Sequence, residues 1–269
     1  MTRLPPLLEP HELNALLEKE PSLLLIDLSA DETWLQGHIP SAVHVSPARI
    51  CCGYAPAPGK LPSKAALEEL LGSIGYQADR PIVVYDDAGS SWAGRMIWTL
   101  DLIGHTNAAL LNGGVEGWAA AGFPLSREKP SVAKNRTAIS INPELVAEKE
   151  EILQHLGDAN YRIWDARSEE EYHGHRVLAE RGGHIPGAIW LEWTDLLDGC
   201  RIRPVAEIQA MLDAAGLTRD KTIVTHCQAH RRSGLTYFVA KKLLNYPAIK
   251  AYPGSWSEWG NLADTPIEY

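Results

Sequence analysis

One cysteine, Cys227, stands where a predicted strand gives way to a predicted helix. The run 223–225 before it is apolar and β-branched, and apolar side chains recur at helical spacing from Leu235 onward. Such a junction gathers unpaired backbone N–H groups and the positive end of a helix dipole, which both favour an anion. Arg231 and Arg232 add positive charge. Because the thiolate is the reactive form of cysteine, we predict that Cys227 is a nucleophile.

The elements that must position this cysteine occur twice along the chain. Four blocks follow one order in both halves: 23–27 with 161–165, 37–45 with 183–189, 81–87 with 221–227, and 112–118 with 252–259. Matching blocks at nearly constant offset indicate a duplication. In each half, short β-branched strands alternate with helical patterns. This alternation predicts an α/β fold of two domains, each a mostly parallel sheet flanked by helices.

We predict a domain at 1–124, a linker at 125–142 and a catalytic domain at 143–269. The chain of 269 residues is long for a single core. The linker is polar and shows no periodicity. An insertion at 174–181 separates the second aspartate strand from the following Gly-His-Ile-Pro block. It is interpreted as a surface loop or as a rim of the site.

Composition and charge argue against several classes of protein. The chain is 45% hydrophobic and 22% charged, which is typical of a soluble globular protein, and its net charge of −9 argues against nucleic-acid binding. No apolar run is long enough for a membrane span, and the first residues lack the apolar core of a signal peptide. We therefore expect a cytoplasmic protein that does not associate with membranes.

The cysteines show neither a disulfide framework nor the paired spacing of a zinc site. Cys51, Cys52 and Cys200 are therefore expected to be reduced thiols without a catalytic role. A buried structural thiol is also the alternative interpretation of Cys227, although its cationic surroundings argue against it. We expect no metal ion at any of these positions.

The repeated motifs resemble tandem rhodanese modules over nearly the whole chain. The shared features are Asp165 with Arg167, the Gly-His-Ile-Pro-Gly-Ala block at 183–188, the cysteine loop and the closing glycine–tryptophan patterns. The loop Cys-Gln-Ala-His-Arg-Arg-Ser is similar to the Cys-Gln-Thr-His-His-Arg-Ser type of bacterial tandem-domain thiosulfate sulfurtransferases. The resemblance implies that Cys227 carries the sulfane sulfur of thiosulfate as a persulfide to a thiophilic acceptor such as cyanide or a thiol. It implies no metal or organic cofactor.

Within this resemblance the loop after Cys227 is expected to bind the substrate. Its residues are Gln228, Ala229, His230, Arg231, Arg232 and Ser233. Their backbone N–H groups can form a concave nest for the leaving oxyanion and for the persulfide. We assign the direct contact with the sulfonate to Arg232. Arg231 and His230 are expected to set the electrostatic field of the site and to form its rim. The expected partners are thiosulfate and a small acceptor, with a sulfur-accepting protein as an alternative, and we expect a monomer.

Three other functions are weighed against this one. Mercaptopyruvate sulfurtransferases hold the substrate carboxylate with an arginine whose place is taken here by Glu171, which disfavours a keto acid. A persulfide carrier or regulatory module acting on a protein is a second alternative, and the intact Cys227 argues against it. A cysteine phosphatase is the third. Its loop is one residue longer than the four residues between Cys227 and Arg232, so a phosphate would not fit.

The first half serves as an internal control. Asp87 stands in the place of Cys227, and its loop has no arginine where the second half has Arg231 and Arg232. Carboxylates at Asp86 and Asp87 would repel thiosulfate, so this half is predicted to be inactive.

Several further residues near the predicted site have a structural interpretation. His38 and His184 recur in both halves although only one half has a nucleophile, so both are interpreted as structural. Arg167 is interpreted as the ion-pair partner of a nearby acid. Trp190 and Trp193 could line the cleft or belong to the core.

Overall fold

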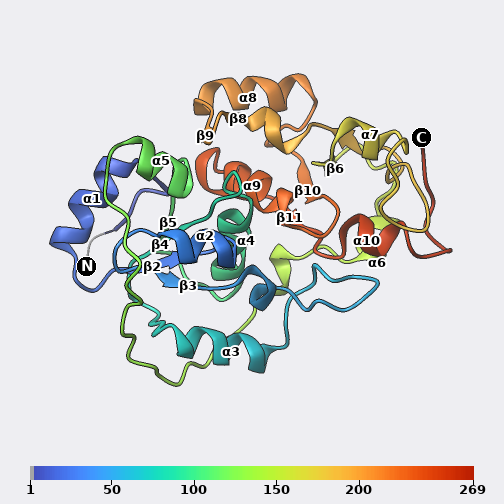
Figure 1. The fold of residues 1–269 in the computed structure, drawn as a ribbon. Coiled ribbons are helices and arrows are strands. Elements are labelled where there is room, and N and C mark those ends of the chain that lie inside the picture. Colours follow the sequence, from blue (N-terminus) through green and yellow to red (C-terminus); the bar gives the residue numbers. More distant parts are fainter. Residues whose placement is uncertain (1–2) are drawn as a thin grey trace. The chain divides into compact units, whose positions relative to one another are not determined.

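The computed structural model describes residues 3–269, which form two compact units (Figure 1). Unit 1 consists of residues 3–50, Pro62–Asn142 and Gly199–Ile202. Unit 2 consists of Cys51–Leu61, Pro143–Asp198 and Arg203–Tyr269. Each unit therefore includes a short segment from the other half of the sequence. The predicted boundaries at 124 and 142 do not set these two short segments apart from the halves of the sequence in which they occur. The division at 124 and 142 stays a prediction.

Unit 1 contains a five-stranded sheet in the order β1-β5-β4-β2-β3, with every neighbouring pair parallel. Its strands are β1 (Leu7–Leu8), β2 (Leu24–Asp27), β3 (Val43–His44), β4 (Ile82–Tyr85) and β5 (Ala108–Leu111). Its helices are α1 (Pro10–Lys19), α2 (Asp31–Gln36), the 3-10 turn Pro47–Ile50, α3 (Lys64–Ser73), α4 (Ser91–Leu102) and α5 (Gly114–Ala120). The short strand β9 (Arg201–Ile202) also belongs to this unit.

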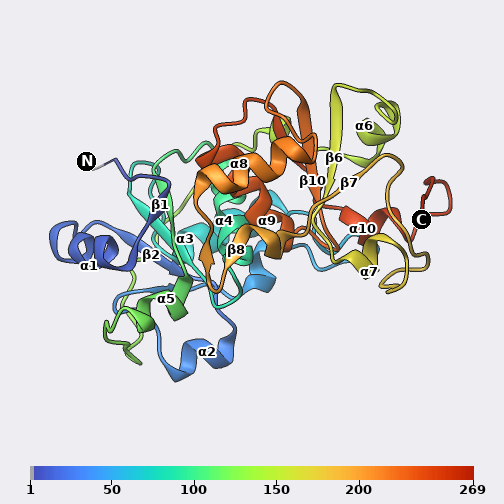
Figure 2. The same cartoon turned by 90° about the horizontal axis from the view of Figure 1, so that it is seen from above.

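Helices cover both faces of this sheet. Leu25, Val83 and Leu111 on one face pack with side chains of α1, α2 and α5 in a single buried cluster. Figure 2 shows α3 and α4 on the opposite side of the strands from α2 and α5. Strands β2, β4 and β5 are therefore buried throughout, as parallel strands between two helix layers should be.

Unit 2 contains a four-stranded parallel sheet in the order β11-β10-β6-β7. Its strands are β6 (Tyr161–Asp165), β7 (Ile189–Trp190), β10 (Thr222–His226) and β11 (Ile249–Ala251), with the short strand β8 (Leu197–Asp198) outside the sheet. Its α-helices are α6 (Lys149–Gln154), α7 (Glu169–Tyr172), α8 (Val205–Ala214), α9 (Arg232–Phe238) and α10 (Ser255–Trp259). It also has 3-10 turns at Pro143–Leu145 and Trp193–Leu196 and a π-helical turn at Val239–Leu243.

The sheet of unit 2 carries Cys227 to its carboxyl edge. Strands β6 and β10 run side by side, and their register pairs His226 with Asp165. Cys227 is the next residue, so it leaves the sheet beside the end of β6. This edge is where open parallel sheets bind their ligands. Among residues 3–269, no helix combines the length and the apolar character that crossing a bilayer requires.

The two repeated histidines have the same surroundings in both units. The His38 ring stacks on Trp34 with ring centres 3.4 Å apart, and its Nδ1 lies 3.1 Å from the Trp34 carbonyl oxygen. The His184 ring stacks on Tyr172 at 3.7 Å, with Nδ1 3.0 Å from the Tyr172 carbonyl oxygen. These contacts fix the chain after a short helix in each unit, and they agree with the structural interpretation of both histidines.

Candidate active site

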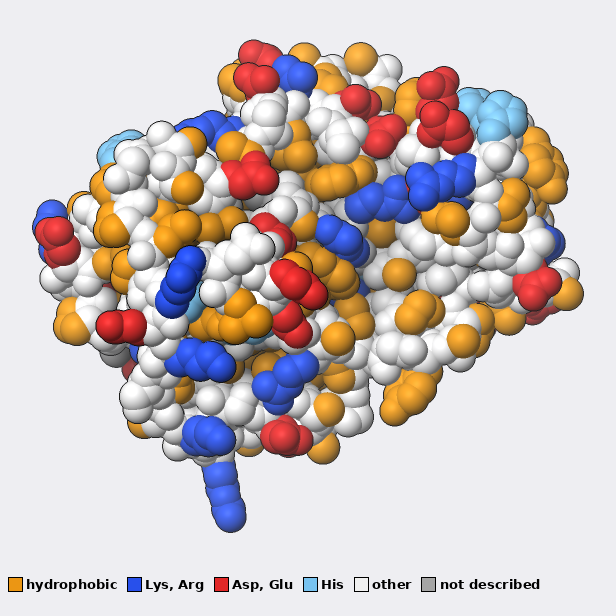
Figure 3. Space-filling model, in the orientation of Figure 1, with side chains coloured by type: hydrophobic (Ala, Val, Ile, Leu, Met, Phe, Trp, Pro, Cys, Tyr) orange, Lys and Arg blue, Asp and Glu red, His pale blue; other side chains and the backbone are white. Residues whose placement is uncertain are grey.

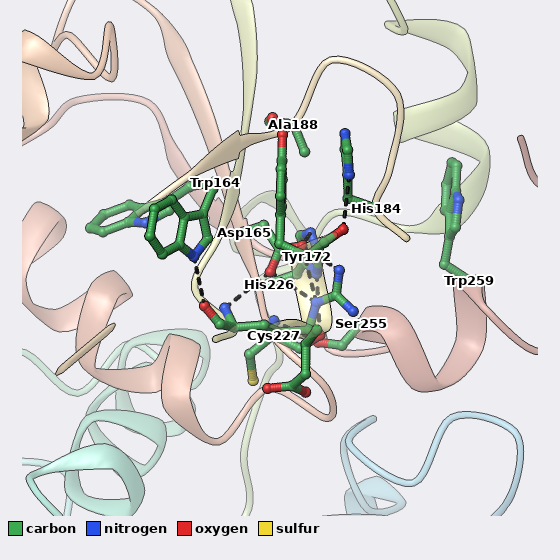
Figure 4. A network of polar contacts seen from close by, with 12 residues as sticks. Trp164, Asp165, Tyr172, His184, Ala188, His226, Cys227, Ser255 and Trp259 are labelled. Atoms are coloured by element: carbon green, nitrogen blue, oxygen red, sulfur yellow. Dashed lines mark hydrogen bonds and ion pairs between the residues drawn. The ribbon is translucent and has the colours of Figure 1, made fainter. Parts of the chain in front are cut away.

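Cys227 begins the tight loop between β10 and α9. Its side chain is 1% exposed. The Ser233 hydroxyl donates to Sγ at 3.4 Å, and the backbone N–H groups of Ser233 and Ala229 help to lower the pKa of the thiol. In Figure 4 the sulfur projects away from the side chains of Tyr172 and His184. The loop therefore surrounds one sulfur atom with several donors, which is an arrangement suited to an anion.

The surroundings of Cys227 favour its thiolate. Burial alone raises the pKa of the Cys227 thiol. The positive charge of Arg232 and the hydrogen bonds from Ser233 and Ala229 outweigh burial, so the pKa lies below its ordinary value. A lower pKa increases the ionised fraction of the thiol, and the thiolate is the reactive form of cysteine.

Arg232 forms a two-pronged ion pair with Glu171. Its Nη1 lies 2.5 Å from Oε2 and its Nη2 lies 2.8 Å from Oε1. Glu171 belongs to α7, is 2% exposed, and also accepts the backbone N–H of Ser168 at 3.2 Å. Burial raises the pKa of Glu171, but the hydrogen bonds and the charge of Arg232 hold it below its usual range. Glu171 is therefore the compensating anion that the arginine at the helix start requires.

This pairing limits what Arg232 can offer a substrate. The guanidinium has five N–H donors, and two bonds to Glu171 leave the others for further contacts. The direct contact between Arg232 and a sulfonate stays a prediction and must use these remaining donors. The sequence indicates both residues but not their pairing, because they lie 61 positions apart along the chain.

His230 does not lie on the rim of the site. Its side chain is fully buried, and its Nδ1 is 2.7 Å from the Ser233 Oγ. The prediction of a rim position for His230 is therefore wrong: its backbone is left-handed, with a φ of 50°, and its buried ring contacts Ser233 instead of solvent. Arg231, the next residue, is exposed, and its effect on the field of the site stays a prediction.

Ser255 holds the loop in place, although no motif in the sequence indicated it. Its Oγ accepts the backbone N–H groups of Cys227 at 3.4 Å and His230 at 3.1 Å, and it donates to the Tyr252 carbonyl at 2.9 Å. Ser255 has a φ of 55°, and Gly114 at the matching place in the first half has a φ of 56°. A serine where the repeat has glycine, in a backbone region that favours glycine, is the signal that could have revealed it.

A segment from the first half of the sequence also contacts the loop within unit 2. Residues 51–61 place Gly59 so close that an added Cβ would lie 2.3 Å from the Ala229 carbonyl oxygen and 2.6 Å from that of Pro253. Lys60 forms ion pairs of 2.8 Å with two glutamates, Glu148 and Glu258. This segment therefore braces the loop from outside, and nothing in the sequence pattern indicated it.

The insertion at 174–181 reaches the loop as well. The Gln228 side-chain amide donates to the Leu178 carbonyl at 2.9 Å, so the insertion is a rim of the site, one of its two predicted interpretations. Val177 is 51% exposed and Leu178 is 46% exposed, so this rim offers apolar side chains to solvent. Figure 3 shows lysine and arginine side chains gathered on the surface below α7, near this part of unit 2.

A buried ionic layer lies behind Cys227. Arg167 Nη2 is 2.6 Å from Asp165 Oδ2, and the guanidinium lies 4.3 Å from the ring centre of Trp256. This pair agrees with the structural interpretation of Arg167. The His226 Nε2 is 3.6 Å from Asp165 Oδ2, and burial lowers the pKa of His226 (Figure 4). The Trp190 Nε1 donates to the Arg167 carbonyl at 3.1 Å, which ties this tryptophan to the same layer.

The matching loop of unit 1 is filled by its own carboxylate. Asp86 is 1% exposed, and its oxygens accept backbone N–H groups at 2.7–2.9 Å from Ala88, Ser90, Trp92 and Ala93. Asp87, at the place of the cysteine, accepts the Thr33 hydroxyl at 2.5 Å and the Ala30 N–H. The donors that could hold an anion are thus engaged within the chain itself.

The fold and the donor-lined cysteine define an α/β protein built from two related modules, one with a cysteine after its central strand and one with an aspartate at that place. The rhodanese-like domain family matches residues 9–121 and 148–262. The chain therefore belongs to the rhodanese-like family, and the predicted fold of two such domains is confirmed.

Two relatives match almost end to end. The chain is 49% identical to a thiosulfate sulfurtransferase of Azotobacter vinelandii, over 98% of this chain and 97% of that protein. It is 47% identical to a thiosulfate sulfurtransferase of Pseudomonas aeruginosa over the same shares. The crystal structure of an anaerobic ergothioneine biosynthesis enzyme from Chlorobium limicola superposes with a TM-score of 0.87, covering 98% of this chain and 70% of that one. At 22% identity, this last likeness concerns the fold alone.

Proposed function

We propose that this chain is a thiosulfate sulfurtransferase that works through a persulfide on Cys227. The observation that carries the proposal is the Cys227 sulfur, surrounded by donors from Ser233 and Ala229 and lying in the field of Arg232. The names of the two near full-length relatives support the same reaction.

The reaction proceeds in two displacements. The Cys227 thiolate attacks the outer sulfur of thiosulfate, the sulfur–sulfur bond of the donor breaks, and sulfite leaves with the bonding electron pair. The terminal sulfur of the resulting persulfide carries the negative charge, which the N–H groups of Ala229 and Ser233 stabilise. An acceptor such as cyanide then attacks that sulfur, and thiocyanate leaves as the Cys227 thiolate is restored.

Thiosulfate suits this site better than 3-mercaptopyruvate. A keto-acid donor carries its carboxylate away from the reacting sulfur and needs a second cation there. Glu171 takes that place by register, and it already holds Arg232 through both guanidinium ends. A second carboxylate would meet the buried charge of Glu171, so the keto acid would bind weakly. The free donors of Arg232 suit the compact sulfonate of thiosulfate.

The roles of the remaining loop residues follow from their contacts. Gln228 anchors the insertion at the rim by its hydrogen bond to the Leu178 carbonyl, and Arg231 contributes positive charge at the surface. His230 contacts Ser233, whose hydroxyl contacts the sulfur. We expect the protein to work as a monomer in the cytoplasm, with a small thiophilic acceptor or a sulfur-accepting protein.

Thiocyanate formation from thiosulfate and cyanide tests the proposal. Cys227→Ser should abolish turnover, and Cys200→Ser, which changes a half-buried thiol of unit 1, should keep most of it. The kcat/KM for 3-mercaptopyruvate should be far below that for thiosulfate. Retained turnover in Cys227→Ser would contradict the reaction, and equal kcat/KM values would contradict the choice of donor.

A further inference from the structure

A chain of short contacts runs from a buried histidine to the sulfur. His230 Nδ1 lies 2.7 Å from Ser233 Oγ, and Ser233 Oγ lies 3.4 Å from Cys227 Sγ. His230 and Ser233 are both fully buried. The spacing of three residues brings their side chains together because the backbone of His230 is left-handed, with a φ of 50°, and its N–H is fixed by Ser255.

The Ser233 hydroxyl has one proton to donate and two neighbours that can accept it. If His230 Nδ1 carries a hydrogen, it donates to the Ser233 Oγ, and the hydroxyl proton must point to the sulfur. If Nδ1 carries none, the hydroxyl can turn to the imidazole and the sulfur loses this donor. A thiolate accepts a stronger hydrogen bond than a neutral nitrogen, so the first arrangement accompanies the ionised cysteine.

We infer that His230 is a positioning residue that orients the Ser233 hydroxyl toward the Cys227 sulfur. This inference rests on the proposed function, in which that sulfur is the nucleophile. His230 touches no substrate in this role. It stabilises the thiolate and then the anionic persulfide by keeping a neighbouring donor turned toward them.

Other charged groups also act on Cys227, so the role of His230 must be separated from theirs. Arg232 on α9 lowers the pKa of the cysteine, and its partner Glu171 on α7 offsets part of that charge. His226 and Asp165 lie at the ends of β10 and β6 behind the loop. None of these residues changes in the variants below, which leaves the field of the site in place.

The test is a pH titration of the thiolate absorbance at Cys227. The signal is the difference between each protein and the same protein carrying Cys227→Ser. His230→Phe keeps a ring but removes the Nδ1–H that fixes and polarises the Ser233 hydroxyl, so the acid dissociation constant of Cys227 should fall roughly tenfold. His230→Asn should restore most of this loss, because its amide nitrogen matches the position of Nδ1 and asparagine tolerates a left-handed backbone.

A double-mutant cycle distinguishes this role from a structural one. In a Ser233→Ala background, His230→Phe should cause no further change in the dissociation constant, since the hydroxyl it orients is gone. An equal change with and without the hydroxyl would overturn the inference, and so would an unchanged constant in His230→Phe. If His230→Phe does not fold, His230→Ala takes its place in the same cycle with the same expected result, and an unchanged constant in Ser233→Ala would also overturn the inference. The titration does not depend on turnover. A wild type that is inactive toward thiosulfate would therefore contradict the proposed function but leave the measured dissociation constants, and the inference on His230, unchanged.

Discussion

Replacing Gly59 with alanine tests whether the segment 51–61 positions the loop 227–233. The new Cβ would lie 2.3 Å from the Ala229 carbonyl oxygen, and ordinary contacts begin at 3.4 Å. Relief of this clash requires a shift of about 1 Å, and the atoms in the way belong to the backbone of Ala229 and Pro253. Because the Ala229 N–H also helps to lower the pKa of the Cys227 thiol, the shift changes the surroundings of the sulfur.

Gly59→Ala is expected to lower both stability and activity, by free energies of similar size. Overpacking of this kind lowers the free energy of unfolding by about 1–3 kcal/mol. A displacement of about 1 Å at a reacting centre costs on the order of 100-fold in rate. Gly59→Ala should therefore fold, unfold at lower urea concentration, and lose about two orders of magnitude in kcat/KM for thiosulfate.

Gly53→Ala is the matched control in the same segment. A Cβ at Gly53 meets nothing within 4 Å, but its φ is 74°. The backbone strain should lower the free energy of unfolding by about 1–2 kcal/mol without moving Ala229, so kcat/KM should change little. Unchanged kcat/KM in Gly59→Ala would refute the bracing role, because the segment would then have moved away instead of the loop. An equal loss in both variants would refute it as well.

Three further predictions concern the ion pair between Arg232 and Glu171 and the loop of the first half. Arg232→Lys keeps a cation but loses the two-pronged contact with Glu171, whereas Arg232→Ala loses both. In Arg232→Ala, kcat/KM for thiosulfate should fall by about 1–3 kcal/mol of transition-state stabilisation, and in Arg232→Lys it should fall by less. Equal kcat/KM in the wild type and Arg232→Ala would exclude a contact between Arg232 and the donor. Burial raises the pKa of Glu171, but Arg232 lowers it by more, so the folded-state pKa lies below the usual range. The ion pair therefore stabilises the fold fully above the unfolded-state pKa of about 4.3. This stabilisation is lost as the pH falls through the lower folded-state pKa. The free energy of unfolding of Glu171→Gln should accordingly fall less steeply on acidification than that of the wild type, and parallel curves would contradict the pairing. The double variant Asp87→Cys, Cys227→Ser should form no persulfide with thiosulfate, because the Asp86 carboxylate occupies the N–H donors of the loop in the first half. A persulfide at position 87 would show that the fold alone activates a thiol.

The parallel sheets and the place of Cys227 follow from local patterns. The β-branched run before Cys227 became β10, and the repeated aspartate strand became its neighbour β6. Apolar runs of this kind are buried between helices whatever lies in the loops, so the strand end and its cysteine could be predicted from the sequence.

The orientation of the loop side chains depends on contacts that the sequence does not display. His230 turns inward because Ser255 fixes its backbone N–H, and Ser255 comes from the next βα connection. Gly59 lies against Ala229 although the two residues are far apart in the sequence. Neither contact leaves a periodic pattern, since each joins single residues of irregular segments whose conformation is set by packing. The comparison of Ser255 with Gly114 was the one available signal.

Intact mass after treatment with thiosulfate tests the central claim most directly. The wild type should gain one sulfur atom, and cyanide should remove it with release of thiocyanate. Cys227→Ser should gain none, although Cys51, Cys52 and Cys200 are unchanged in that variant. A wild type without the added sulfur, or a Cys227→Ser variant that still acquires it, would contradict the assignment of Cys227 as the residue that carries the sulfur.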